Sequence, residues 1–105
     1  MSTDTVGEEI RKRAEAIFYT MIAWRRDFHQ HPELGNQEVR TAKIVADHLK
    51  AVGVDEVYTG IGESTGVLGI IQGALPGPTV GLREDMDALA MKEDTGLPFA
   101  STDTQ

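Results

Sequence analysis

Two carboxylates follow an apolar segment near the end of the sequence. Residues 79–83 read as a strand, and Asp85 and Asp87 come directly after it. Residues two apart in an extended chain point the same way, so both side chains should project from the strand's C-terminal end, where α/β sheets place ligands. Paired carboxylates there could bind a hard cation, orient a metal-ligating histidine or perturb each other's pKa. The alternative is that Asp87 caps a turn and Asp85 is solvated.

A second candidate is the histidine pair His29 and His31. Such a pair can bind zinc when it ends a strand. Here it follows a segment with helical periodicity, where side chains two apart diverge, and the third histidine, His48, belongs to another predicted helix. The pattern therefore favours packing and turn formation over a metal site.

An N-terminal helix should carry this histidine pair at its end. Apolar residues recur at steps of four and three from Ile10 to Phe28, which predicts one helix over about residues 7–29 with Trp24 in the core. Pro32 should turn the chain after it.

A second helix should follow that turn. Asn36 is the predicted N-terminal cap, and apolar residues from Val39 to Val52 form one face. Gly53 stands where a left-handed C-terminal cap is expected, with Val54 folding back on Leu49.

Three short strands are predicted next, at residues 54–58, 67–71 and 79–83. The glycine-rich loop at 60–66 is not a dinucleotide-binding loop, because it leads into a strand rather than a helix. The segment 73–78 between the last two strands has six residues, too few for a parallel crossover, so these strands should form an antiparallel hairpin. From Asp87 to the end the chain should be irregular. The predicted fold is α/β, with two N-terminal helices packed on a mixed sheet that contains a β-hairpin.

Composition narrows the class of protein. At 105 residues, with 40% hydrophobic and 26% charged residues, the chain should form one packed domain at most. The net charge of -7 argues against a nucleic-acid partner. No segment is long and apolar enough to span a membrane, and residues 1–9 lack a signal-peptide pattern. The absence of cysteine fits a reducing compartment, so we expect a cytoplasmic protein.

Several motifs together resemble the metal-dependent amidohydrolase family of hippurate hydrolases, N-acyl-amino-acid amidohydrolases of the aminoacylase and carboxypeptidase type, and auxin-conjugate hydrolases. They are Trp24-Arg25-Arg26-Asp27-Phe28-His29-Gln30-His31-Pro32-Glu33-Leu34-Gly35, Arg40-Thr41-Ala42, Gly60-Ile61-Gly62, Thr65-Gly66-Val67, Pro76-Gly77-Pro78-Thr79-Val80, Leu82-Arg83, Asp85-Met86-Asp87-Ala88-Leu89, Glu93 and Thr95-Gly96-Leu97-Pro98. Their order and number make a chance match improbable.

The resemblance implies hydrolysis of the amide bond of a small N-acyl amino acid by a water that two divalent ions (zinc, manganese or nickel) activate. Asp87 matches the aspartate that supports the metal centre without binding the ion, and Asp85 stands where wider relatives carry a metal-binding histidine. The ligands proper, beginning with Cys-Gly-His-Asp-Gly-His, would lie beyond Gln105. Residues 1–105 would therefore be the first part of a zinc-exopeptidase-like catalytic domain, without the rest of that domain or the dimerisation and lid domain.

This chain alone is accordingly expected to bind no metal and to be inactive, and it could self-associate or form a homo-oligomer. Glu84, Ala90 and the pair Asn36-Gln37 depart from the family pattern. One alternative is a standalone non-catalytic module that binds a partner through its sheet edge. Another is a barrel amidohydrolase that uses His29 and His31, but this would need a strand where the helical period is strongest.

Overall fold

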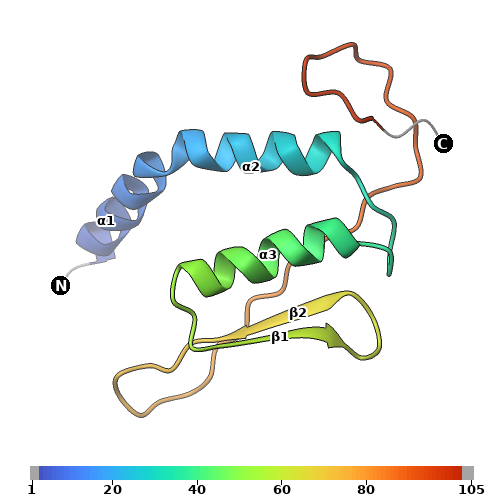
Figure 1. The fold of residues 1–105 in the computed structure, drawn as a ribbon. Coiled ribbons are helices and arrows are strands. Elements are labelled where there is room, and N and C mark those ends of the chain that lie inside the picture. The colour runs from blue at the N-terminus through green and yellow to red at the C-terminus, as the bar shows by residue number, and fades with distance from the viewer. Residues whose placement is uncertain (1–2, 103–105) are drawn as a thin grey trace. The chain divides into compact units, whose positions relative to one another are not determined.

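The computed structural model describes residues 3–102, which divide into two compact units. The first unit contains the residues up to His31 and a C-terminal segment that begins at Glu93. The second unit is Pro32–Lys92. Along the described residues the elements follow in the order α1, α2, α3, β1, β2 (Figure 1). The predicted α/β combination of helices and strands is confirmed.

The single N-terminal helix of the prediction is instead two helices. Helix α1 is Thr3–Ala16 and helix α2 is Phe18–Gln30. Ile17 separates them with φ -108° and ψ 10°, and its N–H donates to Ala14 O three residues back, as in the tightened last turn of a helix. A β-branched residue is a weaker helix former than its neighbours, but the apolar periodicity runs through it and hides the break.

The apolar face of α2 is not the core that its periodicity predicts. Trp24 and Met21 are each 39% exposed, and α2 contains no buried residue. Periodicity identifies which residues share a helix face, but it does not tell what covers that face. The predicted burial of Trp24 is therefore wrong for the structure of residues 3–102.

A C-terminal segment closes onto the end of α2 within the first unit. The N–H and the hydroxyl of Thr102 both donate to Gln30 O, at 2.9 Å each. The Arg26 guanidinium lies 4.4 Å from the centre of the Phe99 ring, and the His29 ring meets that ring edge-on. This segment is irregular, as predicted, as far as Thr102; the last three residues lie outside the described range.

Helix α3, Val39–Ala51, opens the structured part of the second unit. Asn36 is not its cap: Asn36 has φ 63°, and Glu38 occupies the cap position without a side-chain capping bond. The carboxylate of Glu33 caps the helix from a distance, because it accepts the N–H of Arg40 at 3.0 Å and that of Thr41 at 2.6 Å. These are two of the backbone donors that the first turn of a helix leaves unpaired.

The C-terminal end of α3 confirms the predicted glycine cap. Gly53 has φ 89°, in the left-handed region that favours glycine. Its N–H donates to Lys50 O, and the N–H of Val54 donates to Leu49 O, both at 3.1 Å. This pair of bonds is the Schellman arrangement, which satisfies the last carbonyls of the helix and turns the chain toward the first strand.

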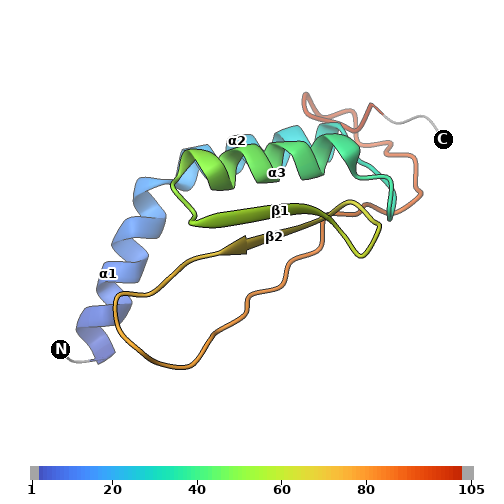
Figure 2. The same ribbon diagram turned by 60° about the horizontal axis from the view of Figure 1, so that its bottom comes forward.

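Strands β1, Glu56–Ile61, and β2, Gly66–Ile70, pair antiparallel in a two-stranded sheet (Figure 2). Tyr58 lies opposite Leu68, and the register shifts between Thr59 and Ile61, beside Gly60 at φ 68°. The glycine-rich loop of the prediction is thus the turn of this hairpin. A left-handed Gly60 at a bulge lets a short connection reverse the chain.

The hairpin predicted between residues 67–71 and 79–83 is wrong. Strand β2 pairs with β1, and residues 79–83 form no strand. Val80 and Leu82 of that stretch are 82% and 86% exposed. The sheet was predicted as mixed, but over residues 3–102 it is antiparallel and two-stranded. A strand-like composition does not by itself give a segment a neighbouring strand to pair with.

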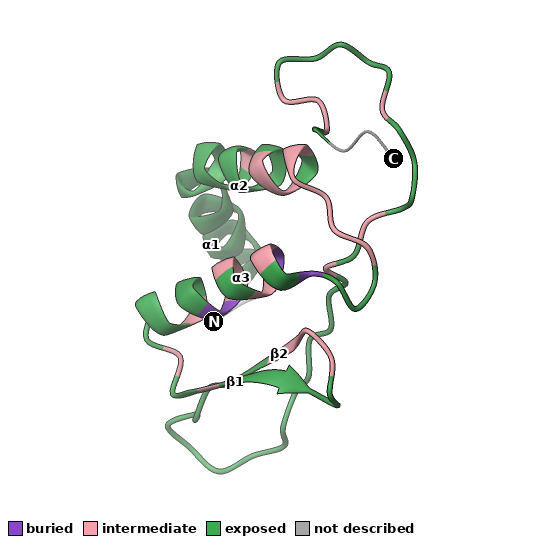
Figure 3. Cartoon of the chain, turned by 45° about the vertical axis from the view of Figure 1, so that its right-hand side comes forward, coloured by how far each residue is buried: buried purple, intermediate pink, exposed green. Residues whose placement is uncertain are grey.

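The small core of the second unit lies where α3 packs on both strands. Its buried residues lie on α3 and directly before it (Figure 3): Ala46, Thr41 and Glu38. A Cβ on Gly69 would come within 3.2 Å of Leu49 Cδ1 and 3.3 Å of Val54 Cγ1, so the lack of a side chain there lets helix and strand approach closely. The packing of α1 and α2 on a sheet stays a prediction.

Candidate functional site

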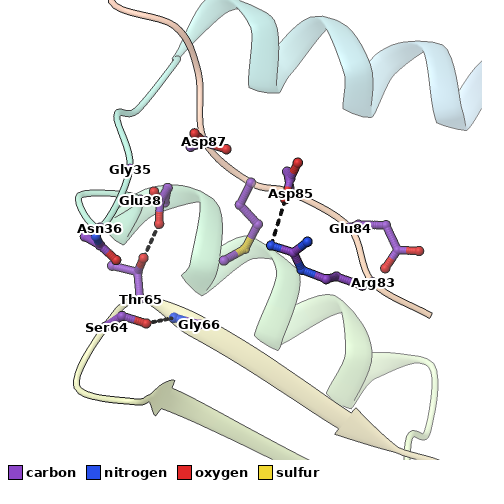
Figure 4. A pocket seen from close by; sticks show the side chains of 11 residues that line it. Gly35, Asn36, Glu38, Ser64, Thr65, Gly66, Arg83, Glu84, Asp85 and Asp87 are labelled. Carbon is purple, nitrogen blue, oxygen red and sulfur yellow. Dashed lines mark hydrogen bonds and ion pairs between the residues drawn. The ribbon is translucent and has the colours of Figure 1, made fainter. Parts of the chain in front are cut away.

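Asp85 and Asp87 line one cavity of about 240 Å³ in the second unit (Figure 4). The other walls come from the turn before α3, through Gly35 and Glu38, and from the turn directly before β2, through Thr65. The structure therefore brings both predicted site residues to the same hollow, although the strand that was expected to present them is absent from the described residues.

The surroundings of the two aspartates differ. Asp85 Oδ1 lies 3.6 Å from Arg83 Nη2, and these side chains are 74% and 92% exposed. An ion pair so accessible to water contributes little to stability. Asp87 is exposed as well, so the two aspartates differ in their neighbours rather than in their exposure.

Asp87 lies beside the turn that precedes α3. A Cβ built on Gly35 would be 3.9 Å from Asp87 Oδ2 and 3.9 Å from Glu38 Oε1, so the two carboxylates flank this glycine. The next residue, Ala88, donates its N–H to Glu33 O at 2.8 Å. The peptide group that follows Asp87 is thus attached to the loop before α3.

Glu38 is a site residue that the sequence interpretation missed. It is only 5% exposed, and its carboxylate accepts a short hydrogen bond from the Thr65 hydroxyl. Glutamates are rarely buried so completely unless they are paired, which is why burial was not expected for an acidic residue before a helix. Its place between the motif that ends at Gly35 and the motif that begins at Arg40 was the only available signal.

The electrostatics of Glu33 follow from its role as a helix cap. Burial alone would raise the pKa of Glu33, but the N–H groups of Thr41 and Arg40 that donate to its carboxylate outweigh burial, so the pKa lies below its ordinary value. The carboxylate is therefore ionised at neutral pH, and its charge also suits the positive end of the helix dipole.

The histidine pair does not form a joint site. His29 Nε2 contacts the Glu93 carboxylate, whereas His31 Nδ1 lies 3.0 Å from Asp27 O and 3.4 Å from Asp27 Oδ1. The pKa of Glu93 is lowered, chiefly by the Thr95 hydroxyl that donates to it and also by His29, against the opposing effect of burial. His29 thus joins α2 to the C-terminal segment, whereas His31 makes a local contact with a residue one helical turn earlier.

The described residues do not by themselves fit a metal centre. Within residues 3–102, no three histidine, aspartate or glutamate side chains lie close enough together to hold an ion, and the sequence has no cysteine. Protein sites for zinc use at least three protein ligands. Asp87 could orient a ligand that another part of a longer protein supplies, but it does not complete a site here.

Comparison with known proteins identifies amidohydrolases and carboxypeptidases among the relatives of this chain. The chain is 45% identical to thermostable carboxypeptidase 1 of Saccharolobus solfataricus over 94 residues, which are 90% of this chain and 24% of that protein. It is 39% identical to the N-acyl-L-amino acid amidohydrolase of Geobacillus stearothermophilus over 94 residues, 90% of this chain and 25% of the relative. It is 48% identical to the hippurate hydrolase of Campylobacter jejuni over 77 residues, 73% of this chain and 20% of the relative.

No protein-family profile matches the chain, and no solved structure matches it. The described part of the chain contains no helix with both the length and the apolarity to cross a bilayer. The chain spans about a quarter of the length of the curated relatives it matches, and these relatives are named as hydrolases. By sequence the chain is thus a relative of the amidohydrolases that include hippurate hydrolase and N-acyl-L-amino acid amidohydrolase. The relationship covers about a quarter of the length of those proteins.

Proposed function

We propose that this chain is the first part of the catalytic domain of a metal-dependent amidohydrolase that cleaves the amide bond of small N-acyl amino acids. The names of the relatives support this substrate class, since they include an N-acyl-L-amino acid amidohydrolase and a hippurate hydrolase. The observation that carries the proposal for this chain is the placement of Asp87, a carboxylate at the wall of a cavity with its backbone attached to Glu33.

The division of roles follows from the two environments. Asp87 would hold a metal-ligating side chain in the orientation that binding requires, as carboxylates beside metal ligands do. Asp85 would have a smaller part, because its carboxylate is paired with Arg83. When bound, two divalent ions (zinc, manganese or nickel) would supply the activated water. Their ligands would come from residues beyond this chain, so residues 1–105 alone would be inactive.

The proposal extends to partners and compartment. The substrate would be a small molecule, and the net charge of -7 disfavours nucleic acid. A chain without cysteine suits the cytoplasm. The dimerisation and lid domain of such an enzyme would lie outside this chain, and we propose homo-oligomer formation for the longer protein.

A chimera tests the proposal. Residues 1–105 would replace the matching segment of the Geobacillus stearothermophilus relative, and hydrolysis of hippurate and N-acetyl amino acids would be followed with and without a chelator. We expect activity that the chelator abolishes, and we expect Asp87→Asn to lower activity or metal affinity by about 10- to 100-fold. Asp85→Asn should lower activity or metal affinity by a smaller factor.

A matched control uses Asp47, an exposed aspartate of α3 that pairs with Lys43. Asp47→Asn should leave the activity of the chimera unchanged. If Asp87→Asn retains full activity with unchanged fold and metal content, Asp87 has no part in catalysis and caps a turn instead.

A non-catalytic module that binds a partner through its sheet edge is the second candidate. The two-stranded sheet favours it, because β1 and β2 each have one edge without a partner strand among residues 3–102. A chimera that folds and binds metal but never hydrolyses substrate would favour this module over the enzyme.

A further inference from the structure

Glu33 connects two parts of the second unit that are far apart in sequence. Its carboxylate accepts the N–H groups of Arg40 and Thr41 in the first turn of α3, at 3.0 and 2.6 Å. Its carbonyl oxygen accepts the N–H of Ala88 at 2.8 Å. One residue thus attaches the peptide that follows Asp87 to the N-terminal end of a helix.

This attachment matters because the chain around Asp87 has little other regular structure. Residues 73–92 contain no helix or strand. Arg83 and Asp85, which precede Asp87, form only an exposed ion pair. The hydrogen bond from Ala88 to Glu33 is therefore the backbone anchor nearest to the candidate site carboxylate.

We propose that Glu33 is a positioning residue for Asp87: its carboxylate fixes the turn to α3, and its carbonyl holds Ala88, so that the Asp87 carboxylate stays beside Gly35 and Glu38. The inference rests on the proposed function only in the part that Asp87 plays there. Glu33 itself touches neither substrate nor any reacting atom, because both of its polar ends are engaged with backbone N–H groups.

The chemistry of the cap explains why a carboxylate is needed. Two N–H groups point at two different oxygens of Glu33. A glutamine would keep the size of the side chain, but its amide has one oxygen and one NH₂ group. The NH₂ group would face a backbone donor, so Glu33→Gln removes one bond and adds a repulsive contact. An aspartate would keep the charge and shorten the reach.

Amide hydrogen exchange of the 105-residue chain, followed by NMR, tests the coupling directly. We expect Glu33→Gln to speed exchange of the Ala88 amide by about 3- to 10-fold, the effect of losing one hydrogen bond. Glu33→Asp should give an intermediate change. The Val54 amide, at the other end of α3, should change little in either variant and reports that the helix remains folded.

The control is again Asp47→Asn, which removes an acidic partner from the same helix without touching Glu33. It should leave the Ala88 amide unchanged. Faster exchange at Arg40 and Thr41 with no change at Ala88 would overturn the inference, because Glu33 would then be a helix cap only. If Glu33→Gln does not fold, the same comparison of exchange at Arg40, Thr41 and Ala88 is made in Glu33→Asp.

The chimera separates this inference from the proposed function. In that protein Glu33→Gln should lower metal affinity, measured by calorimetry, in the same direction as Asp87→Asn but by a smaller factor. A variant that leaves metal affinity unchanged, in a chimera where Asp87→Asn lowers it, would overturn the positioning role alone. Loss of Ala88 protection in Glu33→Gln, with Asp87→Asn fully active, would keep the coupling and overturn the role proposed for Asp87.

Discussion

The hydroxyl of Thr65, in the turn directly before β2, donates a hydrogen bond to the buried carboxylate of Glu38, directly before α3. This bond joins the helix to the hairpin at the wall of the candidate site. Because Glu38 is 5% exposed, water cannot easily replace the hydroxyl if it is removed.

Replacing this donor should therefore destabilise the chain. We expect Thr65→Val to lower the free energy of unfolding by about 1–3 kcal/mol, the cost of leaving a buried acceptor without its donor. Thr59→Val, at an exposed position of β1, is the matched control and should change stability little. Urea denaturation of the two variants measures the difference, and equal stabilities would show that Glu38 finds another partner.

The cap formed by Glu33 should make stability depend on pH. The pKa of Glu33 is lowered below 4.5 in the folded chain, so the folded state binds a proton less readily than the unfolded state. The stabilisation is then fully present above the unfolded pKa and is lost as the pH falls through the folded pKa. The stability difference between the parent chain and Glu33→Gln should be largest near pH 7 and shrink below about pH 4.5. A difference that stays constant from pH 7 to pH 3 would contradict this.

Gly53 should resist substitution. Gly53→Ala forces a side chain into a backbone with φ 89°, and we expect a loss of about 1 kcal/mol in the free energy of unfolding. Gly77→Ala is the control, because no atom lies within 4 Å of a Cβ built there and its φ is not in the left-handed region. Thermal melting of both variants would check the prediction, which fails if the two substitutions have the same effect.

Exposed apolar side chains of residues 71–82 should cause self-association. Leu75, Val80 and Leu82 are 84%, 82% and 86% exposed. Sedimentation velocity should detect association of the 105-residue chain that rises with concentration, and Leu82→Lys should reduce it by removing apolar surface. Tyr19→Lys changes an equally exposed residue of α2 and should have less effect. A monomer at all concentrations, with a sharp melt, would favour an autonomous module.

The chain alone should bind zinc, manganese or nickel weakly if at all. The reason is the lack, within residues 3–102, of three converging metal-binding side chains. Calorimetry should give a dissociation constant above about 1 µM. A stoichiometric site of higher affinity, lost in the double variant His29→Ala and His31→Ala, would instead support the barrel alternative.

The sequence predicts the local features of the fold better than its pairings. The glycine cap at Gly53 and the strand at residues 67–71 depend on nearby residues, and both are confirmed. The break at Ile17 was missed because the apolar periodicity runs through it. The pairing of β2 with β1 was missed because three segments share the same strand-like pattern.

The residues of the candidate site also differ in how well the sequence predicts them. Asp85 and Asp87 could be identified by type and spacing, and the structure places both at one cavity. Glu33 and Glu38 could not, because their importance comes from bonds to residues that only the fold brings near. A sequence shows which side chains are acidic, but it does not show which acids are buried.

The hydrogen bonds from Thr102 to Gln30 join residues 72 positions apart, whereas α3, β1 and β2 are neighbours along the chain. Closing a long loop costs more conformational entropy than closing a short one, and contacts between sequence neighbours form faster. We therefore expect the α3 and hairpin region to assemble first as the chain leaves the ribosome. The hydrogen bonds between Thr102 and Gln30 can form only after residue 102 has been made.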